Sequence, residues 1–155
     1  MRKFIISIDA GTTSNRSILF DLKGKPVFSS QKEFTQYFPK SGWVEHNPEE
    51  IWRTTVKTLK DVIQKAKKLR GKILNIGITN QRETTVLWDK RTGKPVYNAI
   101  VWQDRRQEEF CAKLRKQNKE TMIFNKTGLL IDSYFSGTKI KWILYNVPKA
   151  KKLMN

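Results

Sequence analysis

The stretch from Asp9 to Arg16 (DAGTTSNR) combines a carboxylate, hydroxyl side chains and a glycine. Hydroxyls and backbone N–H groups in a tight turn can bind phosphate oxygens, and Gly11 lets the chain bend sharply enough for these groups to converge. A single carboxylate beside a phosphate suits Mg²⁺, which binds few protein ligands and keeps several waters. The stretch therefore predicts a phosphate-binding turn, with Asp9 as the metal ligand and Thr12, Thr13 and Ser14 as phosphate contacts.

Two alternatives to this prediction stay open. The hydroxyl side chains could satisfy only the backbone of an ordinary hairpin turn, and Arg16 could be an outward-facing strand residue. Two common phosphate motifs are absent, because the sequence contains neither G-x-x-x-x-G-K-[ST] nor G-x-G-x-x-G.

A second candidate set consists of Arg82, Glu83, Trp102 and Tyr134. Each hydroxyl of a polyhydroxy compound both donates and accepts a hydrogen bond, so adjacent Arg and Glu side chains offer what it requires. Trp102 could cover the carbon backbone of such a compound, and Tyr134 offers another donor. A surface ion pair, a core tryptophan and a half-buried tyrosine are the plain alternatives.

The first half of the chain predicts a sheet and one long helix around the first turn. Strands over 4–9, from the turn to Asp21, and over 27–34 form an antiparallel meander. Asn47 is expected to cap a helix that runs to about Arg70, with Pro48 at its first position and Glu50 completing a capping box. The predicted apolar face consists of Trp52, Val56, Leu59, Ile63 and Ala66.

The strand predicted over 73–79 is apolar on nearly every position, which indicates burial on both faces. It follows a helix, so a crossover onto a parallel partner is expected. The polar residues 80–83 come directly after it, where an open α/β sheet presents its ligand-binding edge.

The second half predicts a further hairpin, over 84–88 and 96–101, and two helices. Asp104 is expected to cap the first helix, which buries Phe110, Cys111 and Leu114. A loop is predicted from Thr127 to Ser136, and Ser136 is expected to cap a last helix whose Ile140, Ile143 and Leu144 point inward. Residues 37–46 are predicted to form a loop, and 149–155 a charged stub without a cap.

Composition limits the classes of protein to consider. The formal charge of +17 raises the question whether the chain binds nucleic acid. Because the lysines are spread along the whole length, a basic surface without a specific partner is the preferred interpretation, with a nucleic-acid-binding domain as the alternative. One Cys and one His exclude a disulfide framework and a Cys/His zinc cluster. The apolar start is too short for a signal peptide and no run could span a bilayer, so no membrane partner and a cytoplasmic location are expected.

Five segments resemble, in order and spacing, consecutive segments of the FGGY family of carbohydrate kinases, and in particular its members that phosphorylate glycerol. They are IDAGTTSNRSILFD, GWVEHNPEEIW, ITNQRETTVLWD, YNAIVWQDRR and TGLLIDSYFSGTKIKWIL. The resemblance implies an α/β, ribonuclease-H-like mixed sheet flanked by helices, as in actin and hexokinase. It also implies transfer of a phosphoryl group from ATP to glycerol, with ATP and Mg²⁺ as cofactors.

Carried over position by position, the resemblance implies that the turn residues Gly11 to Ser14 bind ATP phosphates, that Arg16 lies close to them, and that Asp9 serves Mg²⁺. It implies in the same way that Arg82, Glu83, Trp102 and Tyr134 bind glycerol.

The sequence departs from the family pattern at three places. Ala10 stands where Gln is usual, Asn15 where Ser is usual, and Leu130-Ile131-Asp132 where Pro-Leu-Asp is usual. Both Ala10 and Asn15 are expected in the turn, where they would loosen phosphate contacts, and the third departure affects the loop that carries Tyr134.

The resemblance also implies that the chain, residues 1–155, is a partial amino-terminal kinase domain, incomplete at its C-terminal end. The second half of that domain, a second domain and the general-base Asp are expected elsewhere, so that no catalytic residue is expected in this chain, and homo-oligomers are possible for the full-length enzyme. The alternatives are a non-catalytic ATP- or polyol-binding module and a basic nucleic-acid-binding domain.

Overall fold

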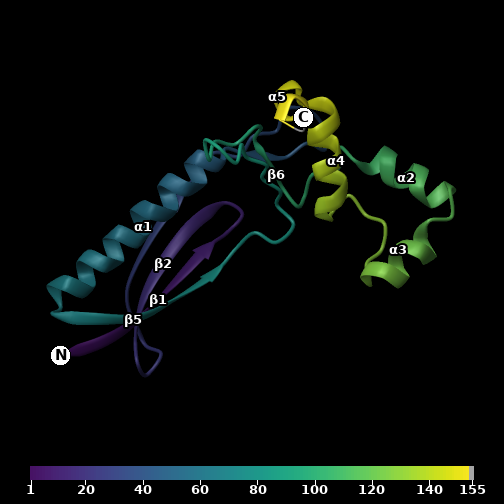
Figure 1. Ribbon diagram of the computed structural model, residues 1–155. Coiled ribbons are helices and arrows are strands. Elements are labelled where there is room, and N and C mark those ends of the chain that lie inside the picture. The colour runs from purple at the N-terminus through teal and green to yellow at the C-terminus, as the bar shows by residue number, and fades with distance from the viewer. Residues whose placement is uncertain (154–155) are drawn as a thin grey trace. The chain divides into compact units, whose positions relative to one another are not determined.

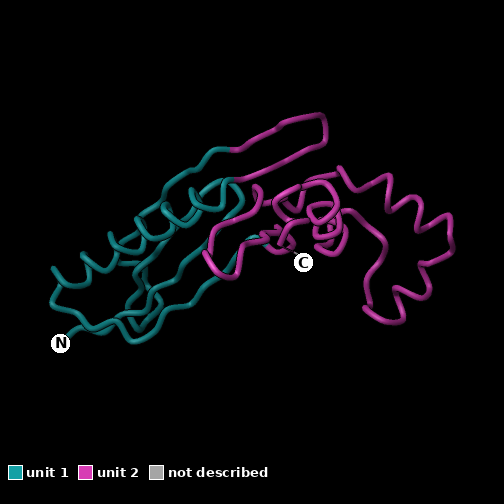
Figure 2. The backbone as a smooth tube through the Cα atoms, turned by 45° about the horizontal axis from the view of Figure 1, so that its top comes forward, with its two compact units in different colours: residues 1–35, 47–81 teal, residues 36–46, 82–155 magenta. Residues whose placement is uncertain are grey.

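The computed structural model describes residues 1–153. The chain forms two compact units, which Figure 2 shows in different colours. The first consists of residues 1–35 and 47–81, and the second of residues 36–46 and 82–155.

The first unit is a mixed four-stranded sheet with one helix (Figure 1). Its elements are β1 (Arg2–Ala10), β2 (Ser14–Asp21), β3 (Pro26–Glu33), α1 (Pro48–Lys68) and β5 (Gly71–Thr79). The strand order is β3-β2-β1-β5. The first three strands pair antiparallel, and β5 pairs parallel with β1. This confirms the predicted meander and the crossover through the helix.

The core of the first unit lies between the sheet and α1. In β1, Phe4, Ile6 and Ile8 are buried on one face, as the period of a strand requires. They form one cluster with Leu19, Val62 and Ala66. Burial of these side chains fixes α1 against the sheet.

The predicted apolar face of α1 is partly wrong. Trp52 is 66% exposed, and the fully buried side chains of the helix are Thr58, Val62 and Ala66. The reason lies in β2, which presents polar side chains to the helix: the hydroxyls of Ser17 and Thr58 lie 2.9 Å apart within a hydrogen bond. A polar residue of the strand requires a polar hydrogen-bond partner on the buried face of the helix. A search for apolar periodicity does not detect such a partner.

The start of α1 is as predicted except for the capping box. Asn47 caps the helix, its side chain accepting a hydrogen bond from the Glu49 N–H at 2.9 Å, and Pro48 is the first helical residue. The carboxylate of Glu50, which the sequence places in a capping box, accepts instead from the hydroxyl of Thr35 at 3.2 Å. This bond ties the helix start to the chain that follows β3.

Strand β5 is an edge strand, contrary to the prediction that both its faces are covered. Leu74, Ile76 and Ile78 are 41%, 49% and 73% exposed. Ile76 and Ile78 pair in register with the buried Ile6 and Ile8 of β1, so part of this apolar surface continues the core face of the sheet.

The second unit contains β4 (Glu45–His46), β6 (Ala99–Ile100), α2 (Glu108–Lys116), α3 (Glu120–Thr127), α4 (Ser136–Asn146) and α5 (Pro148–Leu153). β4, which pairs antiparallel with β6, lies in the predicted loop. The predicted second hairpin is reduced to β6 and isolated bridges between Thr85 and Ile100 and between Trp88 and Pro95.

A buried ion cluster around Arg106 organises the second unit. The guanidinium contacts the carboxylates of Glu45 and Asp104, each at 2.8 Å, and its carbon lies 3.8 Å from the ring centroid of Trp43 and 4.5 Å from that of Trp142. Asp104 is therefore a buried ion-pair partner, and the prediction that it caps α2 is wrong. At the cap position, Gln107 makes no side-chain capping hydrogen bond.

Two helices were not expected from the sequence. The apolar residues of α3, Met122, Ile123 and Phe124, are consecutive, so its sequence lacks the apolar periodicity that predicts a helix. Gly128 ends the helix in the left-handed conformation (φ 72°). α5 occupies most of the predicted charged stub, whose last residues lie outside the described chain. For α4, the structure confirms burial of Ile143, but Ile140 is 39% exposed, and Ser136 is the first helical residue, with Phe135 at the cap.

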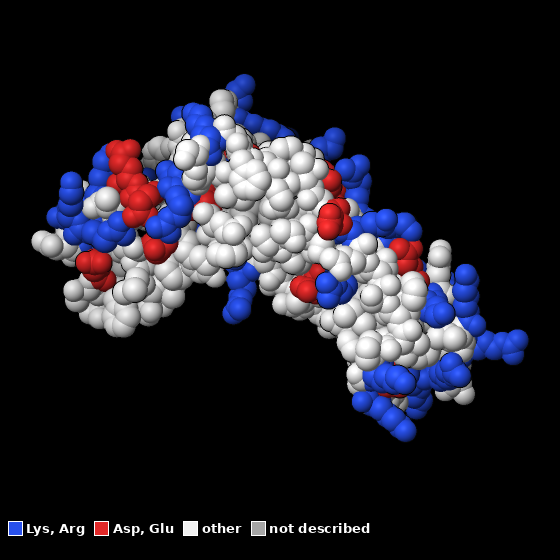
Figure 3. Space-filling model, turned by 180° about the vertical axis from the view of Figure 1, so that it is seen from behind, with Lys and Arg blue, Asp and Glu red and all other residues white. Residues whose placement is uncertain are grey.

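The surface in Figure 3 carries basic side chains over both units, with acidic side chains among them. The view shows no single basic patch from which other residues are excluded. Within residues 1–153, no helix has the length and apolar composition that crossing a bilayer requires.

Candidate functional site

The predicted phosphate turn joins β1 to β2 at one end of the sheet. The N–H of Gly11 donates to the carbonyl of Ser14 at 3.0 Å and closes the turn. A Cβ atom on residue 11 would lie 2.9 Å from that carbonyl oxygen, so the close approach of the backbone requires glycine.

Polar side chains next to this turn line up across three strands. Asp9 is opposite Arg16 in β2, and Arg16 is opposite Gln31 in β3, which places the three on one face of the sheet. The Gln31 amide accepts from the Arg16 guanidinium at 3.0 Å and donates to the Ser14 hydroxyl at 2.8 Å. Because Ser14 Oγ accepts this bond, its own O–H can be donated to an anion.

Asn15 does not belong to the turn, so the prediction of its position is wrong. It lies in β2 with its side chain fully buried against α1. Its amide donates to the carbonyl of Ile51 at 2.9 Å and to the hydroxyl of Thr54 at 2.6 Å. The side chain thus supports the packing of the helix. Ala10, the other departure in this region, ends β1.

Asp9 fits a metal ion only when other ligands come with it. The side chain is exposed at the end of β1, and residues 1–153 contain no group of three or more His, Cys, Asp or Glu that could hold a metal ion. Mg²⁺ commonly takes one or two carboxylates together with water and substrate phosphate oxygens. The residues present therefore suit a magnesium ion that arrives with a nucleotide.

Three of the four predicted polyol residues are brought together in the second unit. The rings of Trp102 and Tyr134 meet edge to face with centroids 6.1 Å apart. Glu83 is joined to Ser136, two residues beyond Tyr134. Arg82, next to Glu83 in the chain, is exposed.

Glu83 is held in an unusual conformation. Its φ is 62°, in the left-handed region that non-glycine residues rarely adopt. Its Oε2 atom accepts from both the backbone N–H and the hydroxyl of Ser136, each at 2.7 Å. A carboxylate at this place also suits the positive end of the α4 dipole. Residues in such a conformation persist where surrounding contacts fix them, as at ligand sites.

The loop that carries Tyr134 is ordered by local hydrogen bonds. Asp132 Oδ1 accepts from the N–H of Tyr134 at 2.7 Å and from the Arg105 guanidinium at 3.1 Å. Ile131 is buried and Leu130 is 68% exposed, so within the Leu-Ile-Asp departure Ile131 packs inward and the Asp132 carboxylate keeps its place.

Lys139 is a member of this cluster that sequence reasoning missed. Its side chain is fully buried, its ammonium donates to the carbonyl of Tyr134, and it lies 5.8 Å from the Tyr134 ring centroid. Burial lowers the pKa of Lys139 to about 8, although the carboxylates of Glu83, Asp104 and Asp132 act in the opposite direction. In a chain with 31 Lys and Arg residues, nothing in the sequence distinguishes this lysine from a surface one.

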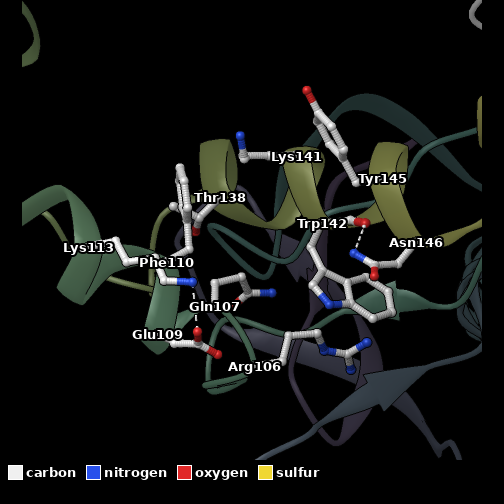
Figure 4. A pocket seen from close by; sticks show the side chains of 10 residues that line it. All are labelled: Arg106, Gln107, Glu109, Phe110, Lys113, Thr138, Lys141, Trp142, Tyr145 and Asn146. Atoms are coloured by element: carbon white, nitrogen blue, oxygen red, sulfur yellow. Dashed lines mark hydrogen bonds and ion pairs between the residues drawn. The ribbon is translucent and has the colours of Figure 1, made fainter.

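A separate cavity of about 270 Å³ lies along α2 and α4 (Figure 4). Arg106, Gln107 and Trp142 are among the residues that line it. None of the four predicted polyol residues does, so the candidate polyol site is the surface beside Trp102 and not this cavity.

The sequence profile described as the N-terminal domain of the FGGY family of carbohydrate kinases matches residues 4–155. The chain belongs to the FGGY family of carbohydrate kinases. This agrees with the family expected from the five segments.

Curated relatives point to one branch of the FGGY family. A glycerol kinase of Malacoplasma penetrans is 60% identical over 149 residues, which are 96% of this chain and 29% of that protein. A glycerol kinase of Petrotoga mobilis is 57% identical over 152 residues, 98% of this chain and 30% of that protein. The chain therefore spans about a third of the length of these relatives.

Solved structures show the same fold. A Plasmodium falciparum glycerol kinase with ADP superposes with a TM-score of 0.90 at 38% identity, over 97% of this chain and 30% of that one. A xylulose kinase from Rhodospirillum rubrum reaches 0.88 at 25% identity, over 97% of this chain and 31% of that one. The α/β fold class expected from the sequence is thus confirmed.

Proposed function

We propose that this chain is the amino-terminal part of an enzyme that transfers a phosphoryl group from ATP to glycerol. The observation that carries the proposal is 60% identity to a glycerol kinase over nearly the whole chain. The two clusters of polar residues supply what such a reaction needs, since phosphoryl transfer depends mainly on positioning and charge neutralisation.

We assign the phosphate end to the turn after β1. Gly11, Thr12, Thr13 and Ser14 bind phosphate oxygens through N–H and hydroxyl groups, and Arg16 adds positive charge. Asp9 holds Mg²⁺, which neutralises charge on the phosphates when it is bound. The cross-strand register of Asp9 and Arg16 supports this assignment, because it puts both at the turn.

We assign the acceptor end to Arg82, Glu83, Trp102 and Tyr134. Glu83 accepts a hydrogen bond from a glycerol hydroxyl, Arg82 donates one, and Trp102 covers the carbon backbone. Because all four residues belong to one compact unit, we further propose that the chain binds glycerol weakly by itself. A cytoplasmic location and homo-oligomers of the complete enzyme stay predictions.

The chain itself is proposed to be a partial domain without turnover. It spans about 30% of the relatives' length, and the group that activates the attacking hydroxyl is expected in the remaining part. The open edge of β5, with Ile78 73% exposed, supports the view that further chain covers it in the complete protein.

The test is an ADP-release assay on the purified chain with ATP, Mg²⁺ and glycerol. We expect no glycerol-dependent ADP release, because binding without the general base does not produce transfer. Glycerol-dependent turnover that Asp9→Ala abolishes would show that the chain is catalytically sufficient.

A non-catalytic binding module is the second candidate, favoured by the cluster that Glu83, Trp102 and Tyr134 form in the second unit. Calorimetry with ATP and with glycerol separates the possibilities. Heat with glycerol that Glu83→Ala abolishes supports the polyol assignment, and the absence of heat with both ligands removes the binding module.

A further inference from the structure

The first turn of α4 carries two residues that touch polyol-site residues. We propose that Ser136 and Lys139 are positioning residues of the polyol site: Ser136 acts through the carboxylate of Glu83, and Lys139 acts through the backbone of Tyr134. This rests on the proposed function, because it takes Glu83 and Tyr134 as polyol contacts.

Ser136 fixes the direction of the Glu83 carboxylate. Its N–H and its hydroxyl both bond to Oε2 at 2.7 Å, so the two donors hold one carboxylate oxygen and orient the other. A glutamate side chain loses considerable rotamer freedom when it is ordered. Because Ser136 already orders the Glu83 side chain before a polyol binds, binding of the polyol does not cost that rotamer entropy.

Lys139 lies one helical turn after Ser136, on the same side of α4. Its ammonium donates to the Tyr134 carbonyl and therefore fixes the backbone that carries the Tyr134 ring. The charged and titratable groups that act on it are the carboxylates of Glu83, Asp104 and Asp132 and the thiol of Cys111.

Neither residue is itself proposed to touch the polyol. Lys139 is fully buried, so a ligand at the surface beside Trp102 cannot reach it. Ser136 directs its hydroxyl at Glu83. Both therefore act through the residues that they hold.

The test for Ser136 compares hydroxyl deletions on the same turn. Thr138 is the matched control, because its hydroxyl bonds to the carbonyl of Phe135 at 3.2 Å and to no assigned polyol residue. Glycerol is titrated into the purified chain and the indole N–H of Trp102 is followed by NMR. We expect Ser136→Ala to weaken glycerol binding about tenfold, as for a lost bond to a charged group. Ser136→Thr and Thr138→Val should stay within about twofold.

The test for Lys139 is the pH dependence of the same titration. We expect glycerol binding by the wild-type chain to weaken as pH rises through about 8, because the charge beside Glu83 and Tyr134 is lost. Lys139→Met should bind more weakly at pH 7 and show a flat profile between about pH 7 and 9. As a check that does not need glycerol, Glu83→Gln should lower the pKa at which the Lys139 ammonium titrates by NMR.

The outcomes distinguish a failure of the polyol assignment from a failure of the positioning roles proposed for Ser136 and Lys139. A folded wild-type chain that binds no glycerol contradicts the polyol assignment, on which the positioning roles of Ser136 and Lys139 depend. Glycerol binding that Ser136→Ala and Thr138→Val affect equally, with the same pH profile in wild type and Lys139→Met, overturns the positioning proposal alone.

Discussion

Single residues decide how the second unit is held together, and the clearest case is Arg106. A buried guanidinium is tolerated because Glu45 and Asp104 both contact it. Burial raises the pKa of Glu45, but hydrogen bonds from Tyr97, Asn98 and Arg106 outweigh it and leave that pKa below its usual value. The ion cluster thus holds β4 and the chain before α2 in place.

We predict that Glu45→Gln destabilises the chain by about 3–5 kcal/mol at pH 7, because it leaves part of a buried charge uncompensated. The free energy of unfolding from urea titrations measures this. Since the pKa of Glu45 is lowered on folding, its contribution is present above the unfolded value and is lost as pH falls through the folded one. The difference between wild type and variant should therefore shrink in acid, and a constant difference down to pH 3 would contradict this reading.

Lys139 changes stability in the same direction as Glu45, but in an alkaline pH window. Its pKa falls to about 8 on folding, so between about pH 8 and 10.5 the unfolded chain binds the proton that the folded chain has released. Stability from this group therefore rises with pH across that window. Relative to Lys139→Met, the wild type should gain up to about 3 kcal/mol, measured by urea unfolding at pH 7.5 and 10. No relative gain would mean that the ammonium is solvated.

At the scale of elements, the sequence predicted where most strands and α1 lie, but it misplaced part of the buried face of α1 and the burial of β5. The N-cap of α1 was predicted because Asn-Pro specifies a helix start locally. The buried face of α1 was not, because Ser17 and Asn15 of β2 select Thr58 and Thr54 as partners. Such pairs join residues about forty positions apart, and periodicity within one helix carries no information about them.

The hydroxyl pair between β2 and α1 gives a prediction at this scale. Thr58→Val should cost about 1–3 kcal/mol, because it leaves the buried Ser17 hydroxyl without its partner. The double variant Ser17→Ala with Thr58→Val should recover most of that loss, since no unpaired group is left. Urea unfolding of the four members of the cycle measures this, and additive losses would contradict it.

The candidate sites also combine features that the local sequence predicts with features that depend on contacts between distant segments. The turn at Gly11 and the set Arg82, Glu83, Trp102 and Tyr134 were singled out by their residue types and given roles by the family resemblance, and those roles stay predictions. Ser136 as the anchor of Glu83 and Lys139 beneath Tyr134 were not singled out. Their roles come from contacts between distant segments, and a lysine in a lysine-rich chain carries no signal of burial.

At the scale of the whole molecule, each of the two compact units contains one of the two proposed binding sites. The first contains the turn assigned to ATP phosphates, and the second contains the residues assigned to glycerol. The chain corresponds to about 30% of its glycerol kinase relatives. Its proposed role is therefore one half of a site that the complete enzyme closes around ATP and glycerol.

The most direct test of this account replaces the matching amino-terminal residues of the Malacoplasma penetrans glycerol kinase, 60% identical over 149 residues, with this chain. We predict that the folded chimera phosphorylates glycerol with ATP, and that Asp9→Ala or Glu83→Ala lowers kcat/KM by at least about a hundredfold. Thr138→Val serves as the control and should leave it nearly unchanged. A folded chimera without glycerol-dependent ADP release, or one indifferent to both substitutions, would contradict the assignment of the two sites.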